Sequence, residues 1–122
     1  MRIAITKHFD FEASHFLPRV PAGHKCGRMH GHSYRVILEC EADEAALTDD
    51  GMVIDYAVIA EKWSLVFDAI DHRTLNDVKG LDNPTTEVLA QWIYRKLKRA
   101  PLRFLRRVTV AESRTTTCTY PA

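Results

Sequence analysis

The feature that most constrains the fold is a pair of long segments in which apolar and polar residues alternate. The first runs from Ile3 to His15 and the second from His30 to Glu41. Because successive side chains of a β-strand point to opposite faces, this period of two predicts two strands, each with one buried face. The buried face of the first strand ends in His15, and that of the second begins with His30 and His32. The two strands therefore carry three histidines at inward-facing positions.

Two helices are predicted between these strands and the C-terminus. Apolar residues at spacings of three and four predict an amphipathic helix over residues 56–70, with Asp55 as its N-cap. A second helix is expected to begin at Asn83 and Pro84, which fit the N-cap and the first helical position, with Glu87 in the first turn. Its apolar stripe consists of Leu89, Trp92, Ile93 and Leu97. Each helix thus offers one apolar face for packing.

The remaining segments complete a sheet. Residues 107–112 alternate again and put Glu112 on the apolar face of a strand, while residues 114–120 extend that strand or pair with it. The apolar run at 52–54 is a candidate for one more short strand. Because the helices are grouped in the middle of the chain, the order predicts an α+β fold with an antiparallel four-stranded sheet and two helices on one face. We expect residues 1–122 to form a single domain, since 122 residues suffice for one core.

Charge and composition exclude several classes of function. The net charge of +1 gives no global attraction for nucleic acid, and no nucleic-acid-binding motif is present. No apolar run reaches the ~18 residues of a membrane span, and the first residues do not have the pattern of a signal peptide. The cysteines, Cys26, Cys40 and Cys118, are an odd number that does not suit a disulfide framework. We expect a cytoplasmic protein with reduced thiols, a small-molecule ligand and no membrane partner.

The histidines have the spacing of metal ligands. Residues two apart on a strand point to the same face about 6.6 Å apart, so His30 and His32 can share one ion at a Zn–N distance of ~2.0–2.1 Å. The small Gly31 between them leaves the approach open. His15 adds a third imidazole from a separate strand, and neutral imidazoles suit zinc. The sequence therefore predicts a zinc site formed by three histidines.

Whether that site is closed or open is not decided by spacing. Cys26, four residues before His30, can be the fourth ligand of a closed structural site, or can leave the fourth position open for chemistry. Asp71 and His72 follow the first helix, where they form either a titratable pair facing a cleft or an ordinary helix terminus favoured by the helix dipole. Glu112 needs a partner if it is buried, because an unpaired buried carboxylate is costly; an edge position in contact with water is the alternative.

Cations are concentrated in one further segment. Residues 95–107 contain seven Lys and Arg residues and no acid. A solvated helix face is the plainer interpretation, but together with Lys25 and Arg28 these cations could attract an anionic, phosphorylated substrate.

The chain resembles a known family over nearly its whole length: the 6-pyruvoyl-tetrahydropterin synthase superfamily, and within it the bacterial branch that acts in queuosine biosynthesis. The resemblance rests on FEASHFLPRVPAGHKCGRMHGHSY, GMVIDYAVI, IDHRTLND, LDNPTTEVLAQWI and VTVAES, which occur in the family's order. The departures are small: Ser14 stands where Ala is common, and AES replaces the more usual KET around Glu112. A branch of folate synthesis carries Glu at the position of Cys26, and is therefore disfavoured.

The resemblance implies roles for particular residues. It implies zinc ligands at His15, His30 and His32, a general base at Cys26, a proton-transfer pair at Asp71 and His72, a pterin-anchoring carboxylate at Glu112, and further pterin contacts from Thr85 and Thr86. It also implies a T-fold (tunnelling fold) domain that forms a homo-oligomer, typically a hexamer built from two trimers, with active sites at subunit interfaces.

The implied activity is that of a zinc-dependent lyase. Its substrate would be 7,8-dihydroneopterin triphosphate, converted to 6-carboxy-5,6,7,8-tetrahydropterin with release of acetaldehyde and triphosphate. Formation of 6-pyruvoyl-tetrahydropterin from the same substrate would use the same residues and is the nearest alternative. A non-enzymatic module stabilised by zinc, with Cys26 as the fourth ligand, is the alternative of another class.

Overall fold

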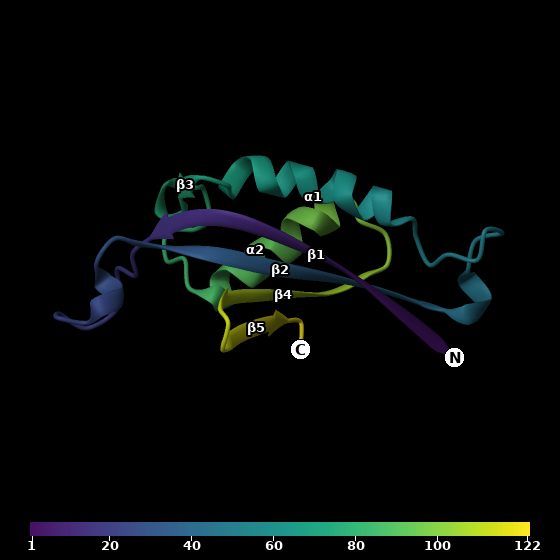
Figure 1. The fold of residues 1–122 in the computed structure, drawn as a ribbon, viewed down its shortest axis with the longest axis horizontal. Coiled ribbons are helices and arrows are strands. Elements are labelled where there is room, and N and C mark those ends of the chain that lie inside the picture. Colours follow the sequence, from purple (N-terminus) through teal and green to yellow (C-terminus); the bar gives the residue numbers. More distant parts are fainter.

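The fold is built around the two long strands that the alternation predicts (Figure 1). The computed structural model describes all residues, Met1–Ala122. The helices and strands are β1 (Arg2–His15), β2 (His30–Asp43), α1 (Tyr56–Ile70), β3 (Arg73–Thr74), α2 (Thr86–Arg99), β4 (Leu105–Ser113) and β5 (Thr116–Tyr120), with three short 3₁₀ turns, η1 (Lys25–Gly27), η2 (Glu44–Ala46) and η3 (Leu75–Asp77). They form one sheet in the order β3-β1-β2-β4-β5, in which only the β1–β3 pairing is parallel.

The pairing of β1 with β2 places the predicted ligands side by side. The two strands are antiparallel over their whole length, so that Arg2 lies opposite Asp43 at one end and His15 opposite His30 at the other. Directly opposite residues of such a pair have Cβ atoms about 4.5–5.5 Å apart. The loop of residues 16–29 connects the strands at this second end (Figure 1, left). The register therefore brings two histidines that are 15 positions apart into contact.

One face of the sheet is buried, as the alternation predicts. The side chains of Val36, Leu38 and Cys40 on β2 are fully buried beneath the helices. Helix α1 packs along β1, and α2 packs on β4 and β5 (Figure 1). Burial of an aliphatic side chain stabilises the fold by roughly 1.5–3 kcal/mol. A slip of β2 by one residue would turn all of these side chains to the solvent face. Packing of the core therefore stabilises the register that aligns the histidines.

The first helix has the bounds that the sequence predicts. It covers Tyr56–Ile70, and the Asp55 carboxylate accepts a hydrogen bond from the backbone N–H of Ala57 at 2.8 Å. Its buried residues recur at spacings of three and four: Ile59, Trp63, Val66 and Ile70. No helix in the structure is both long enough and apolar enough to cross a bilayer.

The structure corrects three predictions about the fold. The sheet has five strands, not four, because β3 adds two residues in parallel to β1, too short a segment to show a periodic pattern. Residues 52–54 form no strand; Val53 is buried as an isolated residue instead. The second helix begins at Thr86 with Thr85 as N-cap, two residues later than predicted from Asn83 and Pro84, because the Thr85 hydroxyl accepts from the Val88 N–H at 3.1 Å.

Candidate metal centre

Three histidine side chains meet where β1 ends and β2 begins. Their ring centroids are 4.7 Å apart for His15 and His30, 4.9 Å for His30 and His32, and 5.1 Å for His15 and His32. Their ligand nitrogens lie within 4.8 Å of one another, and the Nε2 atoms of His15 and His30 are 3.2 Å apart. Nitrogens bound to one tetrahedral zinc ion at ~2.0–2.1 Å are roughly 3.4 Å apart. The cluster therefore has the dimensions of a metal site.

Two backbone carbonyls orient the imidazole rings. Nδ1 of His15 lies 2.9 Å from the carbonyl oxygen of Pro84, and Nδ1 of His30 lies 2.6 Å from that of Arg28. Because a carbonyl oxygen only accepts, each Nδ1 must carry the proton and donate it. In the neutral rings this leaves the Nε2 lone pairs of His15 and His30 directed at each other, which is the arrangement that second-shell hydrogen bonds produce around metal-binding histidines.

The third histidine supplies a buried nitrogen with no hydrogen bond. His32 Nε2 is buried and has no hydrogen-bond partner, although an oxygen of Glu112 lies 3.3 Å away. Burial is the main cause that lowers the pKa of both His15 and His32 below the usual value for histidine. Neutral imidazole is the form that binds metal, and an unsatisfied buried nitrogen calls for a ligand. The three residues thus fit a zinc ion.

Glu112 lies at the edge of this cluster. Its Oε1 atom is 3.4 Å from Nε2 of His15 and 3.3 Å from Nε2 of His32, and its side chain is 29% exposed. The residue sits at an irregularity in the β4–β5 register, between Ala111 and Ser113, and such bulges re-aim a side chain. Glu112 therefore has the histidine cluster as its partner. It is also partly open to solvent, so both features expected from the sequence are present.

Cys26 lies on the loop beside the cluster, and its thiol is not part of it. The residue is in η1 and half-buried, and its carbonyl oxygen accepts from the Leu17 N–H at 2.8 Å, which holds the loop against the end of β1. The group of potential ligands with mutually close donor atoms contains the three histidines and no sulfur. The arrangement with Cys26 as a fourth ligand is therefore not the one that the structure has.

Asp71 and His72 form a close pair in the turn between α1 and β3. His72 Nδ1 lies 2.8 Å from the Asp71 carboxylate, whose other oxygen accepts from the Glu12 N–H at 3.0 Å. The bond from Glu12, and then that from His72, lowers the pKa of Asp71, while the bond to Asp71 raises the pKa of His72. The His72 backbone has φ 56°, and its side chain is 77% exposed. These hydrogen bonds and the positive φ fix the two side chains as a titratable pair, so the pair is not simply a helix end.

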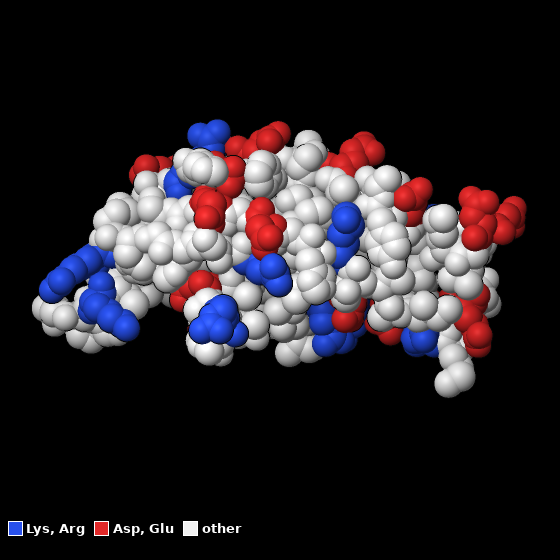
Figure 2. All heavy atoms as spheres, viewed as in Figure 1, with Lys and Arg blue, Asp and Glu red and all other residues white.

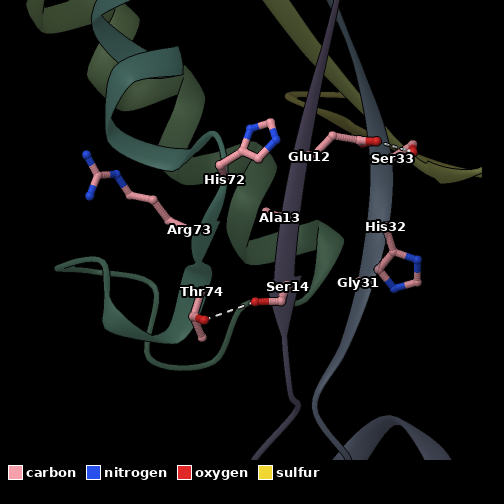
Figure 3. Close-up of a pocket in the computed structure, with 9 residues that line it drawn as sticks. All are labelled: Glu12, Ala13, Ser14, Gly31, His32, Ser33, His72, Arg73 and Thr74. Atoms are coloured by element: carbon pink, nitrogen blue, oxygen red, sulfur yellow. Dashed lines mark hydrogen bonds between the residues drawn. The ribbon is translucent and has the colours of Figure 1, made fainter.

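Within one chain this pair does not contact the histidine cluster. Figure 3 shows the rings of His72 and His32 on opposite sides of β1, bordering a hollow of about 460 Å³. The hollow lies largely over the solvent-facing side of the strands, where Glu12 accepts a 2.6 Å hydrogen bond from Ser33 and Ser14 is 2.9 Å from Thr74. The structure therefore brings together the predicted ligands and Glu112, and leaves the predicted proton-transfer pair apart from them.

The Thr85–Thr86 segment lies next to the cluster through its neighbour Pro84. The Pro84 carbonyl is the acceptor for His15, while Thr85 caps α2 and the Thr86 hydroxyl donates to Glu87 at 2.8 Å. Sequence reasoning did not find the contributions of the Pro84 and Arg28 carbonyls, because every residue carries a carbonyl and none leaves a sequence signal. Tyr34 continues the alternation two positions after His32 and lies buried beside His15.

Charge is distributed unevenly along the molecule. The loop of residues 16–29 carries Arg19, Lys25 and Arg28 and no acid, whereas residues 41–55 carry six acids and no Lys or Arg. Figure 2 shows cations at the end of the molecule where the loop lies and acids at the opposite end. No side chain of the three loop cations forms an ion pair. Unpaired cations thus lie at the end of the molecule that holds the histidines, where they favour the approach of an anion.

The basic segment 95–107 behaves differently. Arg106 and Arg107 pair with Glu41 at 3.5 Å and Glu39 at 2.9 Å, and the Lys98 ammonium donates to the Leu105 carbonyl at 2.9 Å. These contacts occupy three of its seven cations and favour the interpretation of this segment as a solvated, partly paired surface.

The fold and the histidine cluster define an α+β domain that carries a three-histidine metal centre at the end of its two central strands. The family model for 6-pyruvoyl tetrahydropterin synthase matches residues 4–122, and the chain belongs to this family. It is 41% identical over 119 residues to the 6-carboxy-5,6,7,8-tetrahydropterin synthase of Synechocystis sp., covering 95% of this chain and 91% of that one. It is 38% identical over 96 residues to the enzyme of the same name from Bacillus subtilis, covering 74% and 62%.

Structural similarity leads to the same family. The structure of Caenorhabditis elegans 6-pyruvoyl tetrahydropterin synthase superimposes with a TM-score of 0.89 at 27% identity, covering 100% of this chain and 96% of that one. The T-fold expected from the sequence is thereby confirmed, with a sheet of five strands.

Proposed function

We propose that the protein is a zinc-dependent lyase that converts 7,8-dihydroneopterin triphosphate and water to 6-carboxy-5,6,7,8-tetrahydropterin, acetaldehyde and triphosphate, in queuosine biosynthesis. The observation that carries the proposal is the convergence of three Nε2 atoms without a sulfur ligand, in a chain whose relatives at 41% and 38% identity are named for this product. Three protein ligands are the number that catalytic zinc sites use, since the fourth position stays open.

His15, His30 and His32 would hold the zinc ion. When bound, zinc supplies Lewis-acid chemistry that makes the hydroxyls of the substrate side chain more acidic. The carbonyls of Pro84 and Arg28 keep the three-histidine site in one orientation, because they fix the protons of His15 and His30 on Nδ1.

Cys26 would accept the proton from carbon. A thiol has a pKa near ~8.5, so it needs nearby positive charge to react as a thiolate at neutral pH. Lys25 and Arg28 flank it in the sequence, and neither is neutralised by an ion pair. The same two side chains would also attract the triphosphate of the substrate.

Glu112 would orient the pterin ring. A carboxylate can accept two parallel hydrogen bonds from the amino group and a ring N–H of a pterin. Because this carboxylate lies within 3.3–3.4 Å of two ligand nitrogens, a pterin bound to it would lie beside the metal. Thr85 and Thr86, on the segment that follows Pro84, would add contacts to the ring.

Asp71 and His72 would act from a neighbouring subunit. Their separation from the cluster within one chain supports an oligomer in which active sites form between subunits, and we propose a hexamer of two trimers. The edge strands β3 and β5 have no partner on their outer sides, and pairing of such edges between subunits is a common solution. We further propose that residues 1–122 form one T-fold domain and that the protein is cytoplasmic.

Incubation with 7,8-dihydroneopterin triphosphate and zinc tests the proposal. We expect 6-carboxy-5,6,7,8-tetrahydropterin and acetaldehyde by mass spectrometry, and neither from a His30→Ala variant. Formation of 6-pyruvoyl-tetrahydropterin without acetaldehyde would instead support the alternative that the C. elegans structure suggests. Zinc binding without any turnover would support a module in which the metal is structural.

A further inference from the structure

Tyr34 is buried next to the metal cluster, and its hydroxyl has an incomplete set of partners. The residue is 1% exposed, and its ring stacks on Phe11 with centroids 4.7 Å apart and planes inclined by 5°. Its only hydrogen-bonding neighbours are the two nitrogens of His15, at 3.3 Å for Nδ1 and 3.5 Å for Nε2. Buried tyrosine hydroxyls are normally hydrogen-bonded, so the partner of this proton needs to be identified.

Neither nitrogen of His15 can accept that proton when the site is loaded. Nδ1 carries its own proton and donates it to the Pro84 carbonyl at 2.9 Å. Nε2 is the atom that would bind the metal, so its lone pair would be occupied. The nearly equal distances also mean that the hydroxyl lies between two nitrogens whose bonding directions diverge, and faces neither squarely. The Tyr34 oxygen can accept from His15, but its proton remains without an acceptor.

We propose that the Tyr34 hydroxyl donates a hydrogen bond to the oxygen ligand that occupies the open side of the histidine cluster, a substrate hydroxyl or a water molecule. This inference rests on the proposed function for the identity of the substrate, and on the geometry alone for the donor. The hydroxyl lies 3.5 Å from Nε2 of His15, and an oxygen that shares an ion with this nitrogen would lie roughly 3.4 Å from the same atom.

The electrostatics of the residue suit a donor. Glu112 Oε1 lies 3.4 Å from Nε2 of His15, and the Tyr34 hydroxyl lies 3.5 Å from the same nitrogen, so both groups border one position of the cluster. A fixed donor beside an oxygen that gains negative charge during reaction stabilises that charge without any reorganisation.

Tyr34→Phe isolates the hydroxyl, because it keeps the ring and its stacking on Phe11. Tyr94→Phe is the matched control: Tyr94 packs edge-on against Tyr120 at 5.4 Å and does not belong to the histidine cluster. Each protein would be prepared with zinc and with cobalt(II). Acetohydroxamate, an oxygen ligand for metals, would be titrated into the cobalt protein and followed by visible absorption.

We expect full metal content in both variants and an acetohydroxamate Kd about tenfold weaker in Tyr34→Phe, as for loss of a hydrogen bond to a charged group. With the triphosphate substrate, kcat should fall on the order of 10²-fold with little change in KM. Tyr94→Phe should match the wild type in every measurement. If Tyr34→Phe were insoluble, replacement of Tyr34 by 3-fluorotyrosine, a stronger donor of the same shape, should tighten acetohydroxamate binding.

Unchanged acetohydroxamate affinity in Tyr34→Phe at full metal content would overturn the inference. A variant whose metal content and folded fraction fall together would also overturn it, because the hydroxyl would then have a structural role. Failure of the proposed function is a separate result. If the wild type does not turn over the triphosphate while acetohydroxamate binding still depends on the hydroxyl, the donor stands and only the substrate is wrong.

Discussion

Replacement of Cys26 by alanine separates an open catalytic centre from a closed structural one. The loop that carries Cys26 is held by its backbone: its carbonyl accepts from Leu17 at 2.8 Å, and its N–H donates to Nδ1 of His24 at 3.1 Å. Alanine preserves both bonds and removes only a half-buried sulfur. The free energy of unfolding should therefore change by less than about 0.5 kcal/mol, which corresponds to a shift in Tm of no more than about 2–4 °C.

Activity should respond very differently. If Cys26 is the proton acceptor, turnover should fall by a factor on the order of 10² or more, equivalent to about 2.7 kcal/mol of activation free energy. Zinc content should remain near one per chain, because all three imidazoles are still present. The measurements are metal analysis by mass spectrometry, a thermal melt, and product formation from the triphosphate substrate.

Cys118→Ala provides the control for loss of a thiol elsewhere. Burial, followed by the charge of Glu87, raises the pKa of Cys118 on β5, so this thiol should stay protonated and unreactive. Its removal should leave turnover unchanged. If Cys26→Ala instead loses zinc and melts at a clearly lower temperature, the thiolate is a metal ligand, because metal affinity is coupled to folding, and the mechanism proposed above is wrong.

The remaining predictions concern the metal, the proton-transfer pair, the substrate and assembly. His30→Ala should lose most of its zinc, measured by metal analysis; stoichiometric zinc in this variant would contradict the ligand assignment. Asp71→Asn should return the raised pKa of His72 toward the usual histidine value, followed by NMR titration. The pKa of His72 is higher in the folded than in the unfolded state, so its bond to Asp71 stabilises the protein fully only below the pKa that His72 has when unfolded. This stabilisation is lost as the pH rises through the pKa of His72 in the folded state. An unchanged His72 pKa in Asp71→Asn would refute the pairing. Arg28→Met should raise KM for the triphosphate several-fold, and the difference from wild type should shrink at high salt, whereas Arg103→Met, in the basic segment outside the loop, should not change KM. Light scattering at micromolar concentration should give the mass of a hexamer, and a monomer would remove the basis for an active site shared between subunits.

The alternating pattern was enough to predict the two central strands and the grouping of three histidines. Because a strand turns each second side chain to the same face, residues 3–15 and 30–41 define two half-buried strands and put three histidines on one face. The predicted bounds of α1 are likewise correct, since its spacing of apolar residues and its Asp55 cap are both local signals.

Features that depend on contacts between distant segments were decided by the tertiary structure. The second helix begins at Thr86, not after Asn83, because Thr85 caps it, and the Pro84 carbonyl that precedes the cap accepts from His15, 69 positions away. The strand β3 exists only because Arg73 and Thr74 lie against β1, and two residues carry no period.

The same reason limits what the sequence says about the site. It brings His15, His30 and His32 to one face, but the directions of Nε2 in His15 and His30 come from backbone carbonyls whose position no side-chain pattern records. The orientation of Glu112 depends on a bulge that forms only when β4 pairs with β5. Sequence therefore determined which groups are available for chemistry, and the packing of distant backbone segments decided where each one points.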